Sequence, residues 1–267
     1  MSSSLSPVRI AINGAAGRMG LRLVALGKND PGTEIVAAIE VAEHPRLGSD
    51  IGELAAIGKI GVLVTETLER KADVLIDFST PKALDQALDL CMDRRMPFVL
   101  ATTGLAQEQR LRVVEATKTI PVLWSPSMSM AVILTMKLAR IAAEALKDAD
   151  ADVEIIERHH RHKIDAPSGT ALKFGELIAE VMGQTAHRNG RDGKVGERPH
   201  GEIGYHAIRC GDNVGEHTIV FGMLGETLEL SVKASNRDCY ALGALAAAKF
   251  LVGKPAGLYS MNDILGL

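Results

Sequence analysis

The sequence predicts an α/β domain built on a parallel sheet, followed by an α+β domain. Between residues 8 and 124, short apolar runs alternate with segments of helical spacing, which is typical of parallel strands covered by helices on both faces. After residue 130 the alternation stops. A long helix is then followed by strands with short glycine-containing connections, which are typical of an antiparallel arrangement.

In the first half, five apolar runs predict strands, and the segments between them predict helices. The strands are expected at 8–13, 34–39, 72–78, 97–101 and 120–124, and the helices at 18–28, 81–94 and 107–117. Pro81 suits the first turn of its helix, where the missing N–H costs nothing.

In the second half, the pattern predicts helices at 130–146 and 169–182, a strand at 152–157, and a three-stranded antiparallel meander at 202–209, 217–223 and 227–234. Residues 183–201 are rich in Gly, Arg and His without periodicity, which predicts a mobile loop. A last helix at 239–251 is expected to return to the first domain. The predicted domains are 1–128 with 237–267, and 129–236, with hinges near 127–129 and 235–237.

Composition excludes several classes of function. The net charge of -3 and the 3% aromatic content argue against binding to nucleic acid or an anionic membrane. Cys91, Cys210 and Cys239 form no CxxC pair, which argues against a disulfide framework or a cysteine zinc site. Residues 1–7 lack the pattern of a signal peptide, and the apolar run 130–136 is too short to cross a bilayer. We therefore expect a cytoplasmic protein.

The segment from Gly14 to Gly20 follows a predicted strand and opens a predicted helix, which is the context of a dinucleotide-binding turn. Glycines let a pyrophosphate approach the backbone, and the helix N-terminus attracts the anion. Ala15 stands where the first glycine of GxGxxG is expected, so an ordinary glycine turn is the alternative. The candidate cofactor-binding residues here are Gly14, Ala15, Ala16, Gly17, Arg18 and Met19.

Glu40 ends the second predicted strand, where an acid can accept hydrogen bonds from the adenosine ribose hydroxyls. A solvated glutamate at a strand end is the alternative. The next residue is Val41 rather than an arginine, so a 2′-phosphate would meet a carboxylate without a guanidinium beside it. We therefore expect NADH to be favoured over NADPH, although Arg18 remains within reach of a 2′-phosphate.

Two later strands end in polar turns, Asp77–Pro81 and Ala101–Gly104. Ligands of open α/β sheets bind beyond the carboxyl ends of the strands, so Thr102 and Thr103 are candidates to flank a nicotinamide and its ribose. Simple turn chemistry explains either segment when it is taken alone.

The densest group of charged residues lies between Glu157 and Thr170, where three histidines and three fixed cations precede a Ser-Gly-Thr helix start. Backbone N–H groups of Gly169 and Thr170 at that helix N-terminus would hold a carboxylate, and His160 and Lys163 would add positive charge. A histidine and a lysine together can also donate protons. The alternatives are a basic surface loop and a metal site on the histidines, which the neighbouring cations oppose.

The block Glu154–Ala171 resembles the signature of the dihydrodipicolinate reductase family, also called 4-hydroxy-tetrahydrodipicolinate reductases. The resemblance extends along the whole chain and keeps the family order. It includes the Gly14–Gly20 turn, Ala101–Gly104, Gly211–Thr218, Lys233–Arg237 and the late Gly257–Tyr259 segment.

The resemblance implies a Rossmann-like first domain and a second domain whose mixed sheet builds a homotetramer. It implies reduction of a small cyclic dicarboxylate of lysine (diaminopimelate) biosynthesis by hydride from NADH or NADPH. His159 would be the catalytic proton donor and acceptor, Lys163 a second donor, and His160, Gly169 and Thr170 the substrate-binding residues. Cofactor contacts would fall on Gly14 to Met19, Glu40, Ala101, Thr102, Thr103, Ser125, Pro126, Ser127 and Met128, and no metal is expected.

The sequence departs from the family pattern in the segment Pro126–Ile133 and at two single positions. Ser127 replaces a usual asparagine near the nicotinamide, and the arginines that some members carry at the positions of Val41 and Thr80 are missing. The last two departures again favour NADH. Three rival functions remain: a different Rossmann oxidoreductase, a non-catalytic protein of the same fold, and a metal-dependent hydrolase.

Overall fold

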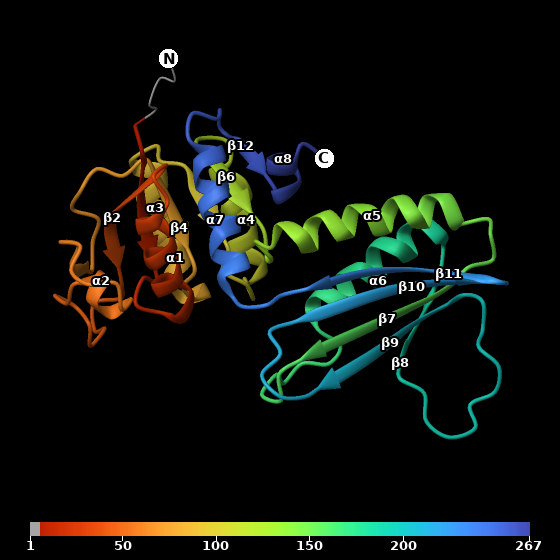
Figure 1. The fold of residues 1–267 in the computed structure, drawn as a ribbon. Helices are drawn as coiled ribbons and strands as arrows, with labels where there is room; N and C mark the ends of the chain where they lie inside the picture. Colours follow the sequence, from red (N-terminus) through yellow and green to blue (C-terminus); the bar gives the residue numbers. More distant parts are fainter. Residues whose placement is uncertain (1–5) are drawn as a thin grey trace, which may run out of the picture. The chain divides into compact units, whose positions relative to one another are not determined.

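In the computed structural model, which describes residues 6–267, the chain forms two compact units (Figure 1). Unit 1 runs to Met130 and includes Asp238–Leu267, and unit 2 is Ala131–Arg237. The divisions therefore fall close to the predicted 128/129 and 236/237. The part of the signal-peptide prediction that concerns Met1–Leu5 lies outside the described residues.

Unit 1 is built on a seven-stranded sheet in which every pair is parallel, as predicted for the first domain. The strand order is β12-β6-β5-β4-β1-β2-β3. The strands are β1 Val8–Asn13, β2 Thr33–Ile39, β3 Val64–Thr65, β4 Val74–Asp77, β5 Phe98–Leu100, β6 Pro121–Trp124 and β12 Gly257–Tyr259. The helices are α1 Arg18–Asn29, α2 Ile51–Leu54, α3 Pro81–Asp93, α4 Gln107–Ala116, α7 Asp238–Leu251 and α8 Met261–Leu265.

Burial explains why these strands read as continuous apolar runs. All residues of β4 and β5 are buried, because helices pack on both sides of the sheet. Helix α7 packs within unit 1, where Gly243 leaves room for the carbonyl oxygen of Met128. The elements β3, α2, β12 and α8 were not predicted, because they span two to five residues and are too short to show a period.

Unit 2 has a five-stranded mixed sheet in the order β11-β10-β7-β9-β8, with two helices on one face (Figure 1). Its elements are α5 Met130–Leu146, which begins at the last residue of unit 1, β7 Asp152–His159, α6 Gly169–Met182, β8 Ala186–Asn189, β9 Glu202–Arg209, β10 Glu216–Met223 and β11 Glu226–Lys233. Apolar side chains of α5, α6 and the covered sheet face form the core of this unit.

The predicted three-stranded meander is wrong. Strands β10 and β11 form the expected hairpin, but β7 lies between β9 and β10, parallel to β9 and antiparallel to β10. Turn chemistry is local and indicates only which consecutive strands can form a hairpin. The position of β7 inside the sheet depends on the burial of Val153 and Ile155. The residues of a turn do not indicate this burial.

The prediction of a mobile loop over 183–201 is also wrong in part. Residues 186–189 form β8, which pairs in parallel with β9. Beyond β8, Arg191 and Arg198 both donate hydrogen bonds to the carboxylate of Glu154 on β7, at 2.7 to 3.0 Å. His206 of β9 lies 2.6 Å from the same carboxylate. Arg191 also binds Glu202, and Arg198 also binds Asp152, so several contacts hold the loop on the sheet.

This network predicts a pH-dependent contribution to stability. Burial alone would raise the pKa of Glu154, but hydrogen bonds from Arg191, Arg198 and His206 lower it from 4.5 to about 2. A carboxyl group with a lowered folded-state pKa stabilises the fold at pH values above its unfolded pKa, and this contribution is lost as the pH falls towards 2.

We expect Glu154→Gln to lower the free energy of unfolding by about 2 kcal/mol near neutral pH. The difference from the unsubstituted protein should shrink as the pH falls from 4.5 towards 2. Denaturant titrations across this range measure both quantities. A loss of stability that is the same at every pH would contradict the assignment to the ionised carboxylate.

Candidate functional site

The candidate cofactor residues of unit 1 all follow the carboxyl ends of parallel strands. Gly14 to Gly17 follow β1 and lead into α1, Glu40 follows β2, and Ala101 to Thr103 follow β5. Residues 125–128 follow β6. Because the strands are parallel and neighbouring, their carboxyl ends share one edge of the sheet, where open α/β sheets bind ligands. The structure thus brings all four segments to the same edge.

The turn after β1 depends on the absence of side chains at two positions. Gly14 has φ +75°, and a β-carbon there would lie 2.8 Å from the carbonyl oxygen of Phe78. A β-carbon at Gly20 would collide with the carbonyl oxygens of Gly14 and Ala15. Gly17 is the N-cap of α1, and it has no side chain to occupy the N–H groups of the first turn. No cap side chain therefore occupies the first N–H groups of α1, and these groups suit an anion.

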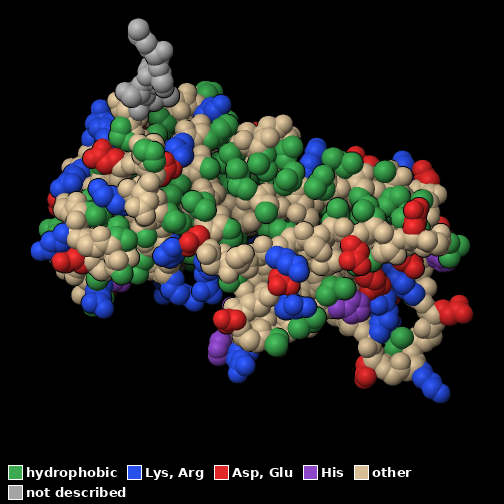
Figure 2. Space-filling view, viewed as in Figure 1, with side chains coloured by type: hydrophobic (Ala, Val, Ile, Leu, Met, Phe, Trp, Pro, Cys, Tyr) green, Lys and Arg blue, Asp and Glu red, His purple; other side chains and the backbone are tan. Residues whose placement is uncertain are grey.

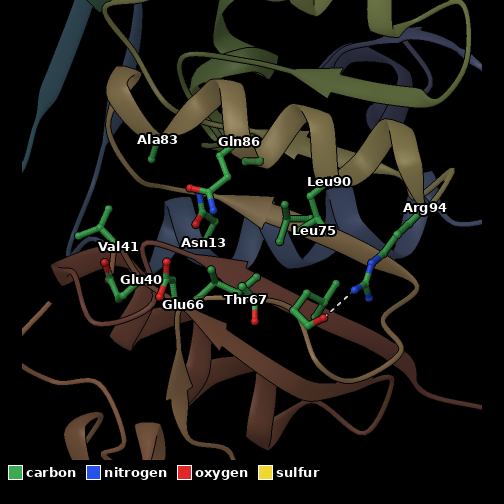
Figure 3. Close-up of a pocket in the computed structure, with 13 residues that line it drawn as sticks. Asn13, Glu40, Val41, Glu66, Thr67, Leu75, Ala83, Gln86, Leu90 and Arg94 are labelled. Carbon is green, nitrogen blue, oxygen red and sulfur yellow. Dashed lines mark hydrogen bonds between the residues drawn. The ribbon is translucent and has the colours of Figure 1, made fainter. Parts of the chain in front are cut away.

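Glu40 and the glycine turn are in direct contact. A carboxylate oxygen of Glu40 accepts a hydrogen bond of 2.9 Å from the backbone N–H of Ala16. Glu40 also lines a pocket of about 340 Å³, together with Val41, Glu66 and Gln86 (Figure 3). Two carboxylates and the apolar side chain of Val41 therefore contribute to the lining of this pocket.

A buried carboxyl group joins three strand ends on this edge. Asp77, at the end of β4, accepts hydrogen bonds from Asn13 at 2.7 Å, Ser79 at 2.6 Å and Thr102 at 2.5 Å. Burial raises the pKa of Asp77, against the effect of these hydrogen bonds. Thr102, a predicted nicotinamide neighbour, is thereby held in place, whereas Thr103 is exposed.

The segment after β6 is partly closed on itself. The hydroxyl of Ser125 donates a hydrogen bond of 2.6 Å to the carbonyl oxygen of Ser127. Ser125 and Met128 are buried, Ser127 is half-buried and Pro126 is exposed. Ser127 and Pro126 are therefore the residues of this segment whose side chains are open to a ligand.

In unit 2, the predicted proton donor His159 is paired with a carboxylate that the sequence analysis had not assigned. Nδ1 of His159 lies 2.6 Å from Oε2 of Glu157, two residues earlier on the same face of β7. Arg209 of β9 donates two hydrogen bonds of 2.7 Å to the same carboxylate. Burial alone would raise the pKa of Glu157, but the bonds from Arg209 and His159 hold it below its ordinary value.

His159 is itself largely buried, and burial lowers its pKa, although the bond to Glu157 acts in the opposite direction. The ring of His217 on β10 meets it edge to face, with 5.2 Å between centroids. Burial lowers the pKa of His217 to about 4, so this second imidazole is neutral near pH 7.

The N-terminus of α6 is connected to the same group. Ser168, its N-cap, accepts a hydrogen bond from the N–H of Ala171, and its hydroxyl lies 3.0 Å from Nε2 of His217. The backbone N–H of Ser168 donates to Glu157 at 3.0 Å. Gly169 and Thr170 follow Ser168 at the start of this 14-residue helix, where Gly169 is exposed.

The remaining cations of the block are partly compensated. Lys163 pairs with Asp165 at 2.7 Å, and Arg158 with Glu216 at 3.4 Å. His160 differs from its neighbours, because its Nδ1 is buried and has no hydrogen-bond partner among residues 6–267.

Among the residues that the structure describes, no group of three His, Cys, Asp or Glu side chains is placed to hold a metal ion. The same part of the chain contains no helix that is long and apolar enough to cross a membrane.

Sequence reasoning missed the residues that support the predicted ones. On unit 2 these are Glu157, Ser168, Arg209 and His217, which lie on three strands and a helix cap. On unit 1 they are Asp77, Glu66 and Gln86. The alternation of β7 was an available signal, because it places Glu157 and His159 on one face. No local pattern marks Arg209 or Gln86.

Comparisons with known proteins agree with the resemblance along the whole chain. Residues 8–128 match the family described as "Dihydrodipicolinate reductase, N-terminus", and residues 131–265 match "Dihydrodipicolinate reductase, C-terminus". A 4-hydroxy-tetrahydrodipicolinate reductase of Rhodopirellula baltica is 54% identical, with 100% of this chain and 99% of the relative covered. One of Pseudomonas fluorescens is 46% identical, with 97% and 99% covered.

A solved structure resembles the fold of both units. The dipicolinate-bound dihydrodipicolinate reductase of Paenisporosarcina sp. TG-14 aligns with a TM-score of 0.75 and 28% identity, covering 95% of this chain and 97% of that one. The two-unit architecture, with a parallel sheet and a mixed sheet, is thus shared with this enzyme.

The glycine turn offers a direct test on unit 1. We expect Gly20→Ala to destabilise the protein by about 2 kcal/mol and to weaken NADH binding, because the new β-carbon would push apart the backbone of the turn. Gly257→Ala is the matched control, since a β-carbon there makes only ordinary contacts with Tyr259. Thermal unfolding and NADH fluorescence titration measure the two effects. Unchanged NADH affinity in a folded Gly20→Ala protein would show that the turn does not bind the dinucleotide.

Proposed function

The chain belongs to the dihydrodipicolinate reductase family, and on that premise we propose that it reduces 4-hydroxy-tetrahydrodipicolinate to tetrahydrodipicolinate in lysine biosynthesis. The observation that carries the proposal is the 54% identity, over the full length, to a relative of that name. The paired His159 and Glu157, beside an open helix N-terminus, provide the acid chemistry that such a reduction needs.

We propose that unit 1 binds NADH or NADPH at the shared edge of its strands. When bound, the nicotinamide supplies the hydride. The Gly14–Met19 turn would hold the pyrophosphate, because no cap side chain occupies the first N–H groups of α1 and the glycines permit close approach. The pocket beside Glu40 and Val41 has the size and the mixed lining to take the adenosine end.

The other cofactor contacts would lie further along the same edge. Thr102, fixed by Asp77, and the neighbouring Ala101 and Thr103 would contact the nicotinamide and its ribose. Ser125, Pro126, Ser127 and Met128 would close this side. Ser127 is shorter than the asparagine usual in the family, so its contact with the carboxamide would be weaker or absent.

We propose that unit 2 binds the dicarboxylate substrate at the start of α6. The N–H groups of Gly169 and Thr170 would donate to one carboxylate, in the partial positive field of the helix terminus. The unpaired ring of His160 would add a further donor. The buried side chains of Glu157 and His217 both contact Ser168, the N-cap of α6. A loop that only binds an anion needs no such buried contacts, so they favour a catalytic site over a simple anion-binding loop.

The proton chemistry belongs to His159 and Lys163. After loss of water, hydride adds to the ring carbon β to the imine carbon, electron density moves towards the ring nitrogen, and a proton must arrive to complete the reduction. His159 would deliver this proton, and Lys163 would be a second donor. In the structure Lys163 pairs with the exposed Asp165. Fixed positive charge around the ring would also stabilise the electron density that develops.

The assembly and location of the protein are also proposals. We propose a homotetramer built on the sheet of unit 2, because the face opposite α5 and α6 exposes the apolar side chains of Ile156 and Ile208, at 38% and 40%. Helix α5 adds a second set of exposed apolar side chains, Leu134, Leu138 and Ile141. Figure 2 shows hydrophobic side chains at the surface over this helix. A cytoplasmic location agrees with the reduced cysteines that the sequence indicates.

The proposed reaction predicts substrate-dependent oxidation of NADH and NADPH. With the freshly made product of the aldolase step (pyruvate plus aspartate semialdehyde), absorbance at the nicotinamide band should fall faster with NADH than with NADPH at subsaturating cofactor. The reason is that Glu40 and Glu66 repel a 2′-phosphate and Val41 offers no cation, whereas Arg94 of the same pocket is bound to the carbonyl oxygen of Leu68. Oxidation with neither cofactor, by folded protein that binds NADH, would favour the non-catalytic or different-dehydrogenase readings. Equal kcat/KM for the two cofactors would reject the preference alone.

The assigned proton donors predict a separation between catalysis and cofactor binding. His159→Gln and Lys163→Ala should each lower kcat by about 100-fold or more, because general acid catalysis contributes on that scale. The Kd for NADH should change little, since both residues lie on unit 2. Steady-state kinetics and fluorescence titration measure the two quantities. A variant that keeps near-normal kcat would remove that residue from the mechanism.

A further inference from the structure

The pair formed by Glu157 and His159 has the geometry of an oriented acid. The two residues are two positions apart on β7, so both side chains lie on the same buried face of the strand. Glu157 is 1% exposed. The 2.6 Å separation joins the carboxylate to Nδ1, which leaves Nε2 as the other ring nitrogen. Which nitrogen carries the proton in the neutral ring is thus decided by what Glu157 can accept.

The carboxylate of Glu157 has little freedom to turn. Arg209 binds both of its oxygens at 2.7 Å, and the N–H of Ser168 binds Oε1 at 3.0 Å. All of these groups are donors, so the position is built for an ionised carboxylate that only accepts. A fixed acceptor beside Nδ1 places a proton there, and the proton that His159 gains and loses is then the one on Nε2.

The surroundings leave Nε2 open. A β-carbon at Gly215 would lie 3.0 Å from Nε2 and 3.3 Å from Cδ2, so any other residue would cover this nitrogen. The ring of His217 contacts His159 edge to face from β10. The other charges that act on His159 are those of Lys163 and Arg209, and both disfavour a protonated ring. Glu157 is the group that opposes them.

We propose that Glu157 is a positioning residue for the reduction: it holds His159 in the Nδ1–H form and so directs the transferable proton to Nε2, beside Gly215. This inference rests on the proposed function, because it specifies how His159 serves as the acid. It also links the two parts of the substrate site, since the same carboxylate fixes the N–H of Ser168 at the start of α6. One buried charge thereby orients the proton donor and the proposed carboxylate-binding turn.

A purely structural role would be different. Glu157 would then be only the partner of Arg209, comparable to Glu154, which sits on the same strand and binds Arg191 and Arg198. Glu154 has no contact with His159 among the hydrogen bonds and ion pairs of residues 6–267. Glu154→Gln is therefore the matched control, because it removes a similarly paired carboxylate without changing the histidine.

The first test reads the tautomer directly. In ¹⁵N-histidine-labelled protein without substrate, two-bond ring correlations should show neutral His159 protonated at Nδ1, with the signal identified by its loss in His159→Gln. In Glu157→Gln this preference should be lost and the pKa of His159 should fall, whereas Glu154→Gln should leave both unchanged. An Nε2–H form of His159 in the unsubstituted protein would overturn the proposal, and this measurement needs no folded Glu157 variant.

The second test is the pH dependence of kcat with NADH. The rate should fall as the pH rises through the pKa of the donor histidine, and Glu157→Gln should move this fall to lower pH. Near neutral pH, kcat should drop about 10- to 100-fold, a range typical for loss of a group that orients a functional histidine, with little change in the Kd for NADH. Glu157→Asp, which keeps the charge, should retain the position of the fall better than Glu157→Gln.

The two tests separate the inference from the proposed function. If the labelled histidine behaves as expected but no cofactor is oxidised, the reductase assignment fails and the positioning of His159 stands. If the reduction is fast and Glu157→Gln has the same pH profile as Glu154→Gln, the positioning role is rejected while the reductase assignment stands.

Discussion

The ionised carboxylate of Glu157 is the group on which the arrangement of unit 2 depends. It is nearly inaccessible to water, and it is stable there because Arg209, His159 and the N–H of Ser168 all donate to it. A buried charge without such partners would be strongly unfavourable. Strands β7 and β9 and the start of α6 must therefore keep their relative positions for the fold to tolerate it. The same hydrogen bonds hold Glu157 in place beside His159 and so fix the position of that ring.

In unit 1 a second buried carboxyl group, that of Asp77, holds the strand ends in place. The parallel strands of this unit end at one edge, and Asp77 ties the ends of β1, β4 and β5 together through Asn13 and Thr102. Burial of this carboxyl group is tolerated because three donors surround it. The glycine turn leads into α1, and the first N–H groups of this helix can donate to an anion because no cap side chain occupies them. In both units, a buried acid organises groups that are open to a ligand.

Local patterns predicted most of the elements, and the failures share one cause. The strands of unit 1 were recognisable because burial on both faces makes them continuously apolar, as in β4. Strand β8 was missed because its four residues are largely exposed and polar, and they depend on pairing with β9. The position of β7 between β9 and β10 was missed for the same kind of reason. Strand order depends on contacts between distant residues, which turn signals do not record.

The candidate site also has a part that the sequence predicts and a part that only the tertiary structure shows. The sequence by itself determined the chemical inventory: the glycine turn, Glu40 at a strand end, and the His159–Thr170 block with its helix start, because these are contiguous and their residue types restrict the chemistry. Only the tertiary structure decided which of these groups have partners. Arg209 lies 52 residues from Glu157, and Ser168 lies 49 residues from His217. Their hydrogen bonds form because sheet pairing and helix packing bring together parts of the chain that are far apart in sequence. The spacing of residues along the chain does not indicate that these side chains will meet.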